Sequence, residues 1–268
     1  MTQYPMTSYH THSCWSDGQT SIATMIAAAE KTNLQEFGIS DHYVLTPHAG
    51  TDTSWSMPVE RLGEYVDEVL SLSKTSHLTV RLGLEVDYFP ENPEEIRNQL
   101  SPYPFDYLIG SVHFVDTFPV DHSADFWAPL TQADINRIHV EYWQRVAMAA
   151  KSGLFDWLGH LDLVKKFAFR PDIDLSDYIN AALDAIVDAD IAIELNTSGW
   201  DKPCQEAYPN PLILSQCARR NIPVILTADA HSPEELLRHY DRGQNLLNRL
   251  GVRQQDRYCR HQAAPGRE

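Results

Sequence analysis

Short apolar runs alternate with longer amphipathic segments along most of the chain. In segment 20–32, for example, Ile22, Met25, Ile26 and Ala29 recur at the three- and four-residue spacing of a helix. The short apolar runs are typical of buried strands. The expected strands are 8–12, 37–40, 78–86, 107–112, 157–159, 192–195 and 223–227. The expected helices are 20–32, 58–74, 91–100, 131–152, 175–188, 211–220 and 233–250.

This regular alternation of strand and helix predicts an α/β fold with a parallel sheet. The chain has no GxGxxG and no GxxxxGK[ST] motif, so a nucleotide-binding doubly wound sheet has no support. We therefore expect a closed or nearly closed β/α barrel in one domain over 1–268, with a polar tail at 252–268. Segment 114–129 interrupts the alternation, and its Phe, Trp and Pro content predicts an ordered loop over one face.

Composition narrows the choice of partners. The net charge of -16 disfavours a nucleic-acid partner, because nucleic acid is itself a polyanion. Four cysteines without CxxC spacing, Cys14, Cys204, Cys217 and Cys259, are typical of reduced thiols in a cytoplasmic protein. Segment 1–7 does not resemble a signal peptide, and no apolar run is long enough to cross a membrane. We expect a cytoplasmic protein without a membrane partner, and the oligomeric state stays open.

Metal-ligand side chains follow the expected strands at their C-terminal ends, where β/α barrels assemble active sites. They are His10, His12, Asp17, Asp41, His42, Glu85, His113, His160, Glu194, Asn196, Asp229 and His231. In extended backbone, residues i and i+2 point to the same side, so each HxH or DxH pair can aim at one point. Imidazole with carboxylate suits Zn, Mn and Fe, and a carboxylate such as Glu85 can bridge two ions. The set predicts a metal-dependent hydrolase.

A single histidine, or one such pair, would more often be an ordinary hydrogen-bonded residue. Ligand-type residues at seven strand ends are hard to reach by chance. The remaining six histidines are assigned such ordinary roles in loops, helices or the tail. They are His48, His77, His122, His139, His239 and His261.

Several of these motifs resemble the PHP (polymerase and histidinol phosphatase) superfamily. They include Tyr9-His10-Thr11-His12-Ser13, Gly38-Ile39-Ser40-Asp41-His42, Gly110-Ser111-Val112-His113-Phe114 and Ala228-Asp229-Ala230-His231. The run Glu194-Leu195-Asn196-Thr197-Ser198-Gly199 is similar to the monofunctional histidinol-phosphatases. The resemblance implies a distorted seven-stranded (βα)7 TIM-like barrel with three divalent ions, Mn, Fe or Zn. It also implies hydrolysis of L-histidinol phosphate to L-histidinol and phosphate, a step of histidine biosynthesis.

The resemblance also implies how the ligands divide among the ions. One ion would be held by His10, His12, Glu85 and Asp229, a second by Glu85, His113 and His160, and a third by Asp17, His42 and His231. Glu85 and Asp229 would act in catalysis as members of the centre. The identity of the general acid stays open between Asp229 and a water.

Many members of the superfamily carry arginines in the loops after strands five and six, where phosphate and substrate bind. This chain has Lys165, Lys166 and Arg170 after His160, and Lys202 further on. A lysine binds phosphate as a point charge, without the arginine fork. With Glu194 and Asn196, these residues form the expected substrate-binding set.

Three alternatives remain. Another PHP-type phosphoesterase, acting on a different small phosphomonoester or a phosphodiester, would have the same metal ligands. A proofreading nuclease is disfavoured because it would ordinarily be joined to a polymerase, and this chain is short and acidic. A non-catalytic metal-binding module is disfavoured because none of the ligands is lost.

Overall fold

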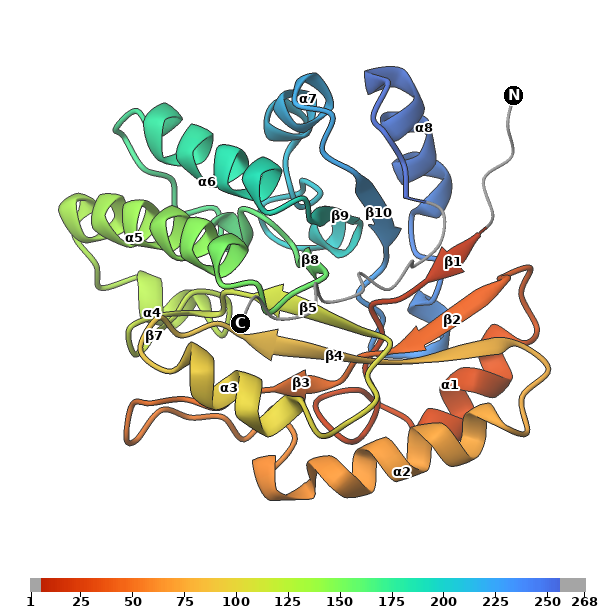
Figure 1. Cartoon of the computed structure of the whole chain (residues 1–268). Helices are drawn as coiled ribbons and strands as arrows, with labels where there is room; N and C mark the ends of the chain where they lie inside the picture. The colour runs from red at the N-terminus through yellow and green to blue at the C-terminus, as the bar shows by residue number, and fades with distance from the viewer. Residues whose placement is uncertain (1–5, 256–268) are drawn as a thin grey trace, which may run out of the picture.

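The computed structural model describes residues 6–255, and the expected tail lies mostly outside that range. Seven parallel strands follow one another around a nearly closed barrel, which confirms the distorted (βα)7 fold (Figure 1). In spatial order they are β1 (Thr7–Ser8), β2 (Glu36–Ile39), β4 (Thr79–Asp87), β5 (Tyr107–Ser111), β8 (Trp157–Leu158), β9 (Ala192–Asn196) and β10 (Val224–Thr227). A short strand, β3 (His42–Tyr43), extends the β2 side and pairs with β4.

The barrel closes between the segments that follow β1 and β10, and we call this junction the seam. The nitrogen of His12 donates to the Ala230 carbonyl at 2.8 Å, and the nitrogen of Ala230 donates to the His10 carbonyl at 3.2 Å. The regular ladder of β1 with β2 covers only Thr7 and Ser8, so the first strand is shorter than expected. Beyond it, the backbones of His10 and His12 bond to Ala230 after β10, while the Thr11 carbonyl accepts the backbone N–H of Ser40 after β2 at 2.9 Å.

The helices lie outside the sheet (Figure 1). They are α1 (Ile22–Ala29), α2 (Leu62–Ser73), α3 (Pro93–Leu100), α5 (Gln132–Lys151), α6 (Ser176–Asp188), α7 (Pro211–Arg219) and α8 (Tyr240–Leu250). Helix α5 begins at a capping box, in which the Thr131 side chain and the Asp134 side chain each bond the other's backbone N–H. The expected helix over 233–250 is wrong in extent. A 3-10 turn, η4 (Pro233–Glu235), is separated from α8 by His239, whose φ of 56° interrupts a helix.

The insertion at 114–129 is more ordered than the expected loop. It contains an antiparallel hairpin of β6 (Phe114–Val115) and β7 (Phe118–Pro119), followed by the short helix α4 (Ala124–Trp127). Trp127 is buried, and its indole nitrogen donates to the Val120 carbonyl at 3.0 Å. This bond holds the segment between the hairpin and the helix in place.

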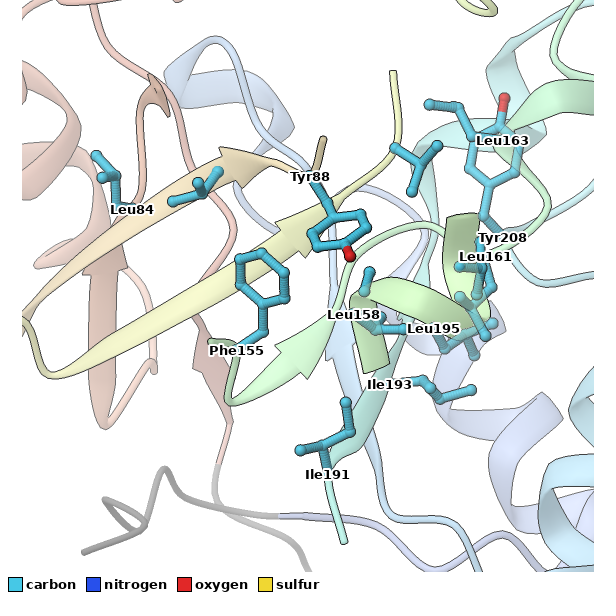
Figure 2. Packing of buried hydrophobic residues seen from close by; sticks show 14 of the residues in the cluster. Leu84, Tyr88, Phe155, Leu158, Leu161, Leu163, Ile191, Ile193, Leu195 and Tyr208 are labelled. Carbon is cyan, nitrogen blue, oxygen red and sulfur yellow. The ribbon is translucent and has the colours of Figure 1, made fainter. Parts of the chain in front are cut away.

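Two apolar regions support the barrel. Inside it, residues such as Tyr9, Tyr107 and Trp157 form a separate buried cluster. Outside it, a larger core packs the strands against the helices; Figure 2 shows Leu158 of β8 near Ile193 of β9, its register partner. Side chains two residues apart on a strand share a face, so the polar residues at the strand ends lie directly above this inner apolar cluster.

The C-terminal end of the described range pairs with the last strand. The backbone of Val224 in β10 bonds to Arg253 and Gln255, so the start of the expected tail runs beside the last strand. Cys14, Cys204 and Cys217 are free thiols, while Cys259 and His261 lie outside the described residues. No helix between residues 6 and 255 has the length and apolar character needed to cross a membrane.

Candidate metal centre

Glu85, which is 1% exposed, lies at the centre of the nine predicted ligands and is close to five of the histidines among them. Its Oε2 lies 3.0 Å from His10 Nε2, 2.9 Å from His42 Nδ1 and 3.4 Å from His12 Nε2. Its Oε1 lies 2.8 Å from His160 Nε2 and 3.6 Å from His113 Nε2. One carboxylate from β4 therefore contacts imidazoles that come from four other parts of the barrel.

Two further carboxylates complete the group. Asp229 Oδ1 lies 3.2 Å from His12 Nε2 and 3.6 Å from His10 Nε2. Asp17 Oδ1 lies 3.2 Å from His231 Nε2 and 3.6 Å from His42 Nε2. The structure therefore brings the strand-end residues together, as the sequence predicted. The role of each residue as a metal ligand stays a prediction.

The polar atoms at the middle of this cluster fit metal ions better than hydrogen bonds. His10 Nε2, both nitrogens of His12, His42 Nδ1 and Glu85 Oε2 are buried, yet none has a hydrogen-bond partner of acceptable geometry among the described residues. Such atoms are costly to bury unless something else satisfies them. Lone pairs of imidazole and carboxylate that face a common point are the donor set of Zn, Mn and Fe.

The ligand atoms fall into overlapping groups in which all atoms lie within 4.8 Å of one another. These groups are His12, Asp17, His42 and His231; His10, His160 and Asp229; His10, His12 and Glu85; and His42, Glu85 and His113. The first contains the whole set that the family resemblance assigns to the third ion. The other two ions share residues around Glu85, so the division of ligands between them stays a prediction.

The charges of the cluster favour cations. Burial alone would raise the pKa of the Glu85 carboxyl, but the surrounding histidines, His42 and His10 foremost, hold it well below its ordinary value. The pKa of Asp229 is likewise held low against burial by His10 and His12. Burial lowers the pKa of His12 to about 3, with the help of His42 and His231, so this imidazole is neutral and able to bind a metal.

Glu194 and Asn196 were expected to bind substrate, but both are buried behind the ligands and neither lines the cavity described below. Glu194 Oε2 lies 2.9 Å from His10 Nδ1, and Oε1 accepts the backbone N–H of His160 at 2.7 Å. The amide of Asn196 donates to Glu194 Oε1 at 2.9 Å and to Asp229 Oδ2 at 3.1 Å. These two residues orient the ligands, as outer partners of metal-binding histidines usually do.

Two more aspartates hold parts of the centre in place: Asp87, which the sequence did not single out, and Asp41, which was counted among the strand-end residues but not among the nine ligands. Asp87 lies 2.9 Å from His113 Nδ1 through Oδ2 and accepts the backbone N–H of His113 at 3.0 Å. The sequence could have indicated this role, because Asp87 lies two residues after Glu85 and both side chains share a face of β4. Asp41 accepts hydrogen bonds from the Ser13 backbone at 2.7 Å and the Ser16 hydroxyl at 2.6 Å, which fixes the loop that carries Asp17.

A pair of charged residues after β10 holds the last two ligands. Glu235 accepts the backbone N–H of His231 at 2.8 Å and the guanidinium of Arg238 at 2.9 Å. Arg238 also donates to the carbonyls of Ala228 and Asp229, at 2.8 and 3.2 Å. Asp229 has a φ of 52°, so these bonds support a backbone conformation that few residues other than glycine adopt.

A cavity of about 310 Å³ opens directly onto the cluster. Besides metal ligands, its wall includes three cationic side chains, Lys166, Lys202 and Arg238. Lys166 forms an ion pair with Asp121 at 3.1 Å, whereas no ion pair of Lys202 occurs among residues 6–255. A cationic wall beside a metal cluster can hold an anion such as a phosphate group.

The other two basic residues expected to bind substrate point elsewhere. Lys165 is 2% exposed, and its ammonium group donates to Asp162 at 2.8 Å and to the Ala207 carbonyl at 2.7 Å. Arg170 is largely exposed and lies 3.4 Å from Glu206. Neither lines the cavity, so the structure brings only Lys166 and Lys202 of the expected basic residues to it.

The histidines that were assigned no metal role lie apart from the cavity wall, as far as the structure describes them. His139 contacts the Phe169 carbonyl at 3.0 Å, and His239 contacts Asp201 at 2.8 Å. Trp55 packs its ring against His42 and His113, with centroids at 4.7 and 5.3 Å.

Comparison with known proteins gives consistent results. A protein of Deinococcus radiodurans named "Probable histidinol-phosphatase" is 39% identical over 188 residues, which make up 69% of this chain and 71% of that protein. The histidinol-phosphatase of Bacillus subtilis is 27% identical over 244 residues, covering 83% of this chain and 91% of its own. A crystal structure of the Lactococcus lactis histidinol phosphate phosphatase, in complex with zinc, L-histidinol and phosphate, has a TM-score of 0.75 at 20% identity. That match covers 92% of this chain and 94% of the other, and it shows the shared fold.

The model of the PHP domain family matches residues 8–198. The matched range contains the strand ends from His10 to Asn196, and Asp229 and His231 follow it with the spacing described above. Because the family model matches more than half of the chain, and a relative is 39% identical over 69% of it, the chain belongs to the PHP domain family.

Proposed function

We propose that this protein is a metal-dependent phosphatase that hydrolyses L-histidinol phosphate to L-histidinol and phosphate. The observation that carries the proposal is the group of nine His, Asp and Glu side chains centred on Glu85, six of them buried, with a cationic cavity beside it. The names of the relatives support the same reaction, since each is called a histidinol-phosphatase. The Lactococcus lactis structure supports it further, because that protein binds zinc together with both products.

Divalent ions would be held by the nine residues in the three sets that the family resemblance implies. Bound there, they would supply positive charge to the phosphate oxygens and lower the pKa of a water molecule that attacks phosphorus. Mn, Fe and Zn all suit the imidazole and carboxylate donors present.

The chain's own residues prepare this site in two ways. Glu194 accepts a hydrogen bond at His10 Nδ1, so that the proton of this imidazole stays on Nδ1 and the lone pair of Nε2 faces the centre. Asp87 does the same for His113. Both bonds orient the imidazole rings and favour the tautomer in which Nε2 is free for a metal ion once that ion has displaced the proton.

Lys166 and Lys202 would hold the phosphate group. Both line the cavity, and each carries a charge opposite to that of a phosphomonoester dianion. Lysine offers no bidentate fork, so several cations around the phosphate share the task that paired arginines perform in many relatives.

A phosphate-release screen tests the proposal. The purified protein, loaded in turn with Mn, Fe and Zn, is given L-histidinol phosphate, a panel of other metabolite phosphomonoesters and one phosphodiester. We expect kcat/KM to be highest for L-histidinol phosphate and to be lost in Glu85→Gln, which serves as the matched inactive control. A higher kcat/KM for another phosphomonoester would identify that ester as the substrate in place of L-histidinol phosphate. A preference for the diester would overturn the phosphomonoesterase assignment.

A further inference from the structure

Asp121 is an acidic residue of the cavity wall that belongs neither to the nine ligands nor to the Glu235–Arg238 pair. It lies in the insertion between β7 and α4, a segment that the barrel itself does not need. The residue before it is firmly placed, because the nitrogen of Val120 donates to the carbonyl of His113 at 2.9 Å. The insertion thus brings a carboxylate to a fixed position beside the metal cluster.

The surroundings of Asp121 keep it charged. Burial alone would raise the pKa of its carboxyl, but Lys166 and His113 lower it below the ordinary value. A carboxyl group with a lowered pKa stays ionised near neutral pH and is a poor proton donor. Asp121 is therefore better suited to bind a cation than to protonate a leaving group.

Asp121 also retains binding capacity. Within residues 6–255 its one hydrogen bond comes from Lys166 and uses Oδ2, so no hydrogen bond among these residues engages Oδ1. The other non-ligand carboxylate of the cavity, Glu235, has both oxygens engaged, one by the His231 backbone and one by Arg238. A carboxylate can accept several hydrogen bonds, so Asp121 can keep Lys166 and accept a second cation.

We propose that Asp121 is a specificity-determining residue that binds the ammonium group of the substrate, so that the site prefers phosphomonoesters bearing an amine next to the ester carbon. This inference rests on the proposed function. In L-histidinol phosphate the amine is on the carbon adjacent to the ester CH2, so the ammonium group must lie close to the phosphate. Asp121 shares the cavity wall with the predicted ligands His113 and His160 and interacts electrostatically with both, so a group that close to the phosphate would lie within its reach.

The pairing also explains the position of Lys166. With the phosphate on Lys166 and the ammonium on Asp121, each charge of the substrate meets the opposite charge of a preformed ion pair. A substrate lacking the amine would leave Asp121, whose side chain is 23% exposed, without its second partner. Leaving a polar group unpaired is the stronger basis for discrimination, because its cost exceeds the gain of an ordinary hydrogen bond.

The test compares two substrates in two variants. The substrates are L-histidinol phosphate and its analogue without the amine, 3-(imidazol-4-yl)propyl phosphate, assayed by phosphate release with the Mn-loaded protein. Asp121→Asn keeps the shape of the side chain and removes its charge. Asp125→Asn is the matched control, since Asp125 lies in the same insertion and is exposed.

We expect Asp121→Asn to lower kcat/KM for L-histidinol phosphate by roughly 10- to 150-fold, the range of one hydrogen bond to a charged group. For the analogue without the amine, kcat/KM should change far less, and Asp125→Asn should change neither. Equal losses on both substrates would overturn the proposal, since Asp121 would then act only by placing Lys166. A wild-type protein that does not distinguish the two substrates would overturn it as well.

Failure of the proposed function would look different. If the wild type hydrolyses other phosphomonoesters but not L-histidinol phosphate, the same variants are compared on phosphoethanolamine and ethyl phosphate, which differ by one amine. Loss of selectivity for phosphoethanolamine in Asp121→Asn would still support the role of Asp121, and unchanged selectivity would overturn it. Thermal unfolding of each variant shows whether a loss of activity comes from a loss of fold.

Discussion

Lys165 and Lys166 are adjacent in the chain but lie in different surroundings. Replacing each of them by methionine should therefore affect a different property of the protein. Lys165 is buried against Asp162, and Lys166 lines the cavity beside Asp121. Methionine keeps most of the length and apolar stem of lysine while removing the charge. Lys165→Met should therefore lower stability, and Lys166→Met should lower activity.

The cost of Lys165→Met follows from its buried partner. Removing one member of a buried ion pair destabilises a protein by about 3–5 kcal/mol. The lower end applies here for two reasons. Asp162 keeps the backbone N–H of Asn210 at 3.1 Å, and burial already raises its pKa to about 6, so it can take up a proton once the lysine is gone. We expect the free energy of unfolding to fall by about 3 kcal/mol near neutral pH.

The cost of Lys166→Met falls on catalysis. Its pair with Asp121 is partly exposed, at 20% and 23%, so the contribution of that pair to stability is at most about 1 kcal/mol. A lost contact with the substrate phosphate costs on the order of 1.5–3 kcal/mol of transition-state binding, which is roughly a 10- to 150-fold fall in kcat/KM.

Urea unfolding and steady-state phosphate release, measured on the same preparations, separate the two effects. Lys31→Met is the control, because Lys31 is exposed and far from the cavity wall. If Lys165→Met lowers kcat/KM with no loss of stability, or Lys166→Met lowers stability with no loss of kcat/KM, the assignment of the two side chains is refuted.

Three further outcomes are expected. Glu85→Gln should lower kcat by more than about a hundredfold, the upper end for changes in the outer partners of metal ligands, while circular dichroism stays unchanged; an unaltered kcat would remove Glu85 from the centre. Elemental analysis of protein purified without chelator should find more than one divalent ion per chain, and chelation should abolish activity; full activity without metal would contradict the centre. Burial lowers the pKa of His139 to about 4, so the unfolded chain binds a proton below about pH 6.5 that the folded chain refuses, and stability falls as the pH drops toward 4. His139→Gln should remove about 2 kcal/mol of the loss between pH 7 and pH 5 in urea titrations, and an identical pH dependence of variant and wild type would contradict this assignment.

The strand ends could be predicted because their information is local. A strand presents alternate residues to one face, so His10 with His12 and Asp229 with His231 identify a shared target without knowledge of the fold. The parallel order of the strands then brings the ends together. Glu85 could be placed at the centre on the same grounds, although its contacts with five imidazoles could not.

The side-chain directions in turns could not be predicted in this way. Lys165 and Lys166 are consecutive, but they lie at the end of a 3-10 turn, η2 (Leu163–Lys165), where neighbouring side chains diverge. Arg238 reaches the site from the segment between η4 and the break at His239. No local pattern reveals that break, since the apolar spacing continues through it. The two-residue strands of the insertion are too short to show alternation, so Asp121 had no signal of its own.

The seam described above has a consequence for when the centre can form. His10 and His12 lie on one side of it and Asp229 and His231 on the other, as the red β1 and the blue β10 indicate in Figure 1. During synthesis, His10 and His12 leave the ribosome early, whereas Asp229 and His231 leave it only after most of the barrel has been made. A growing chain therefore carries an incomplete ligand set until β10 has emerged, and any ion it captures before then is held by fewer donors. Stable metal uptake should follow barrel closure, so the bound metal would mark a chain that has finished folding.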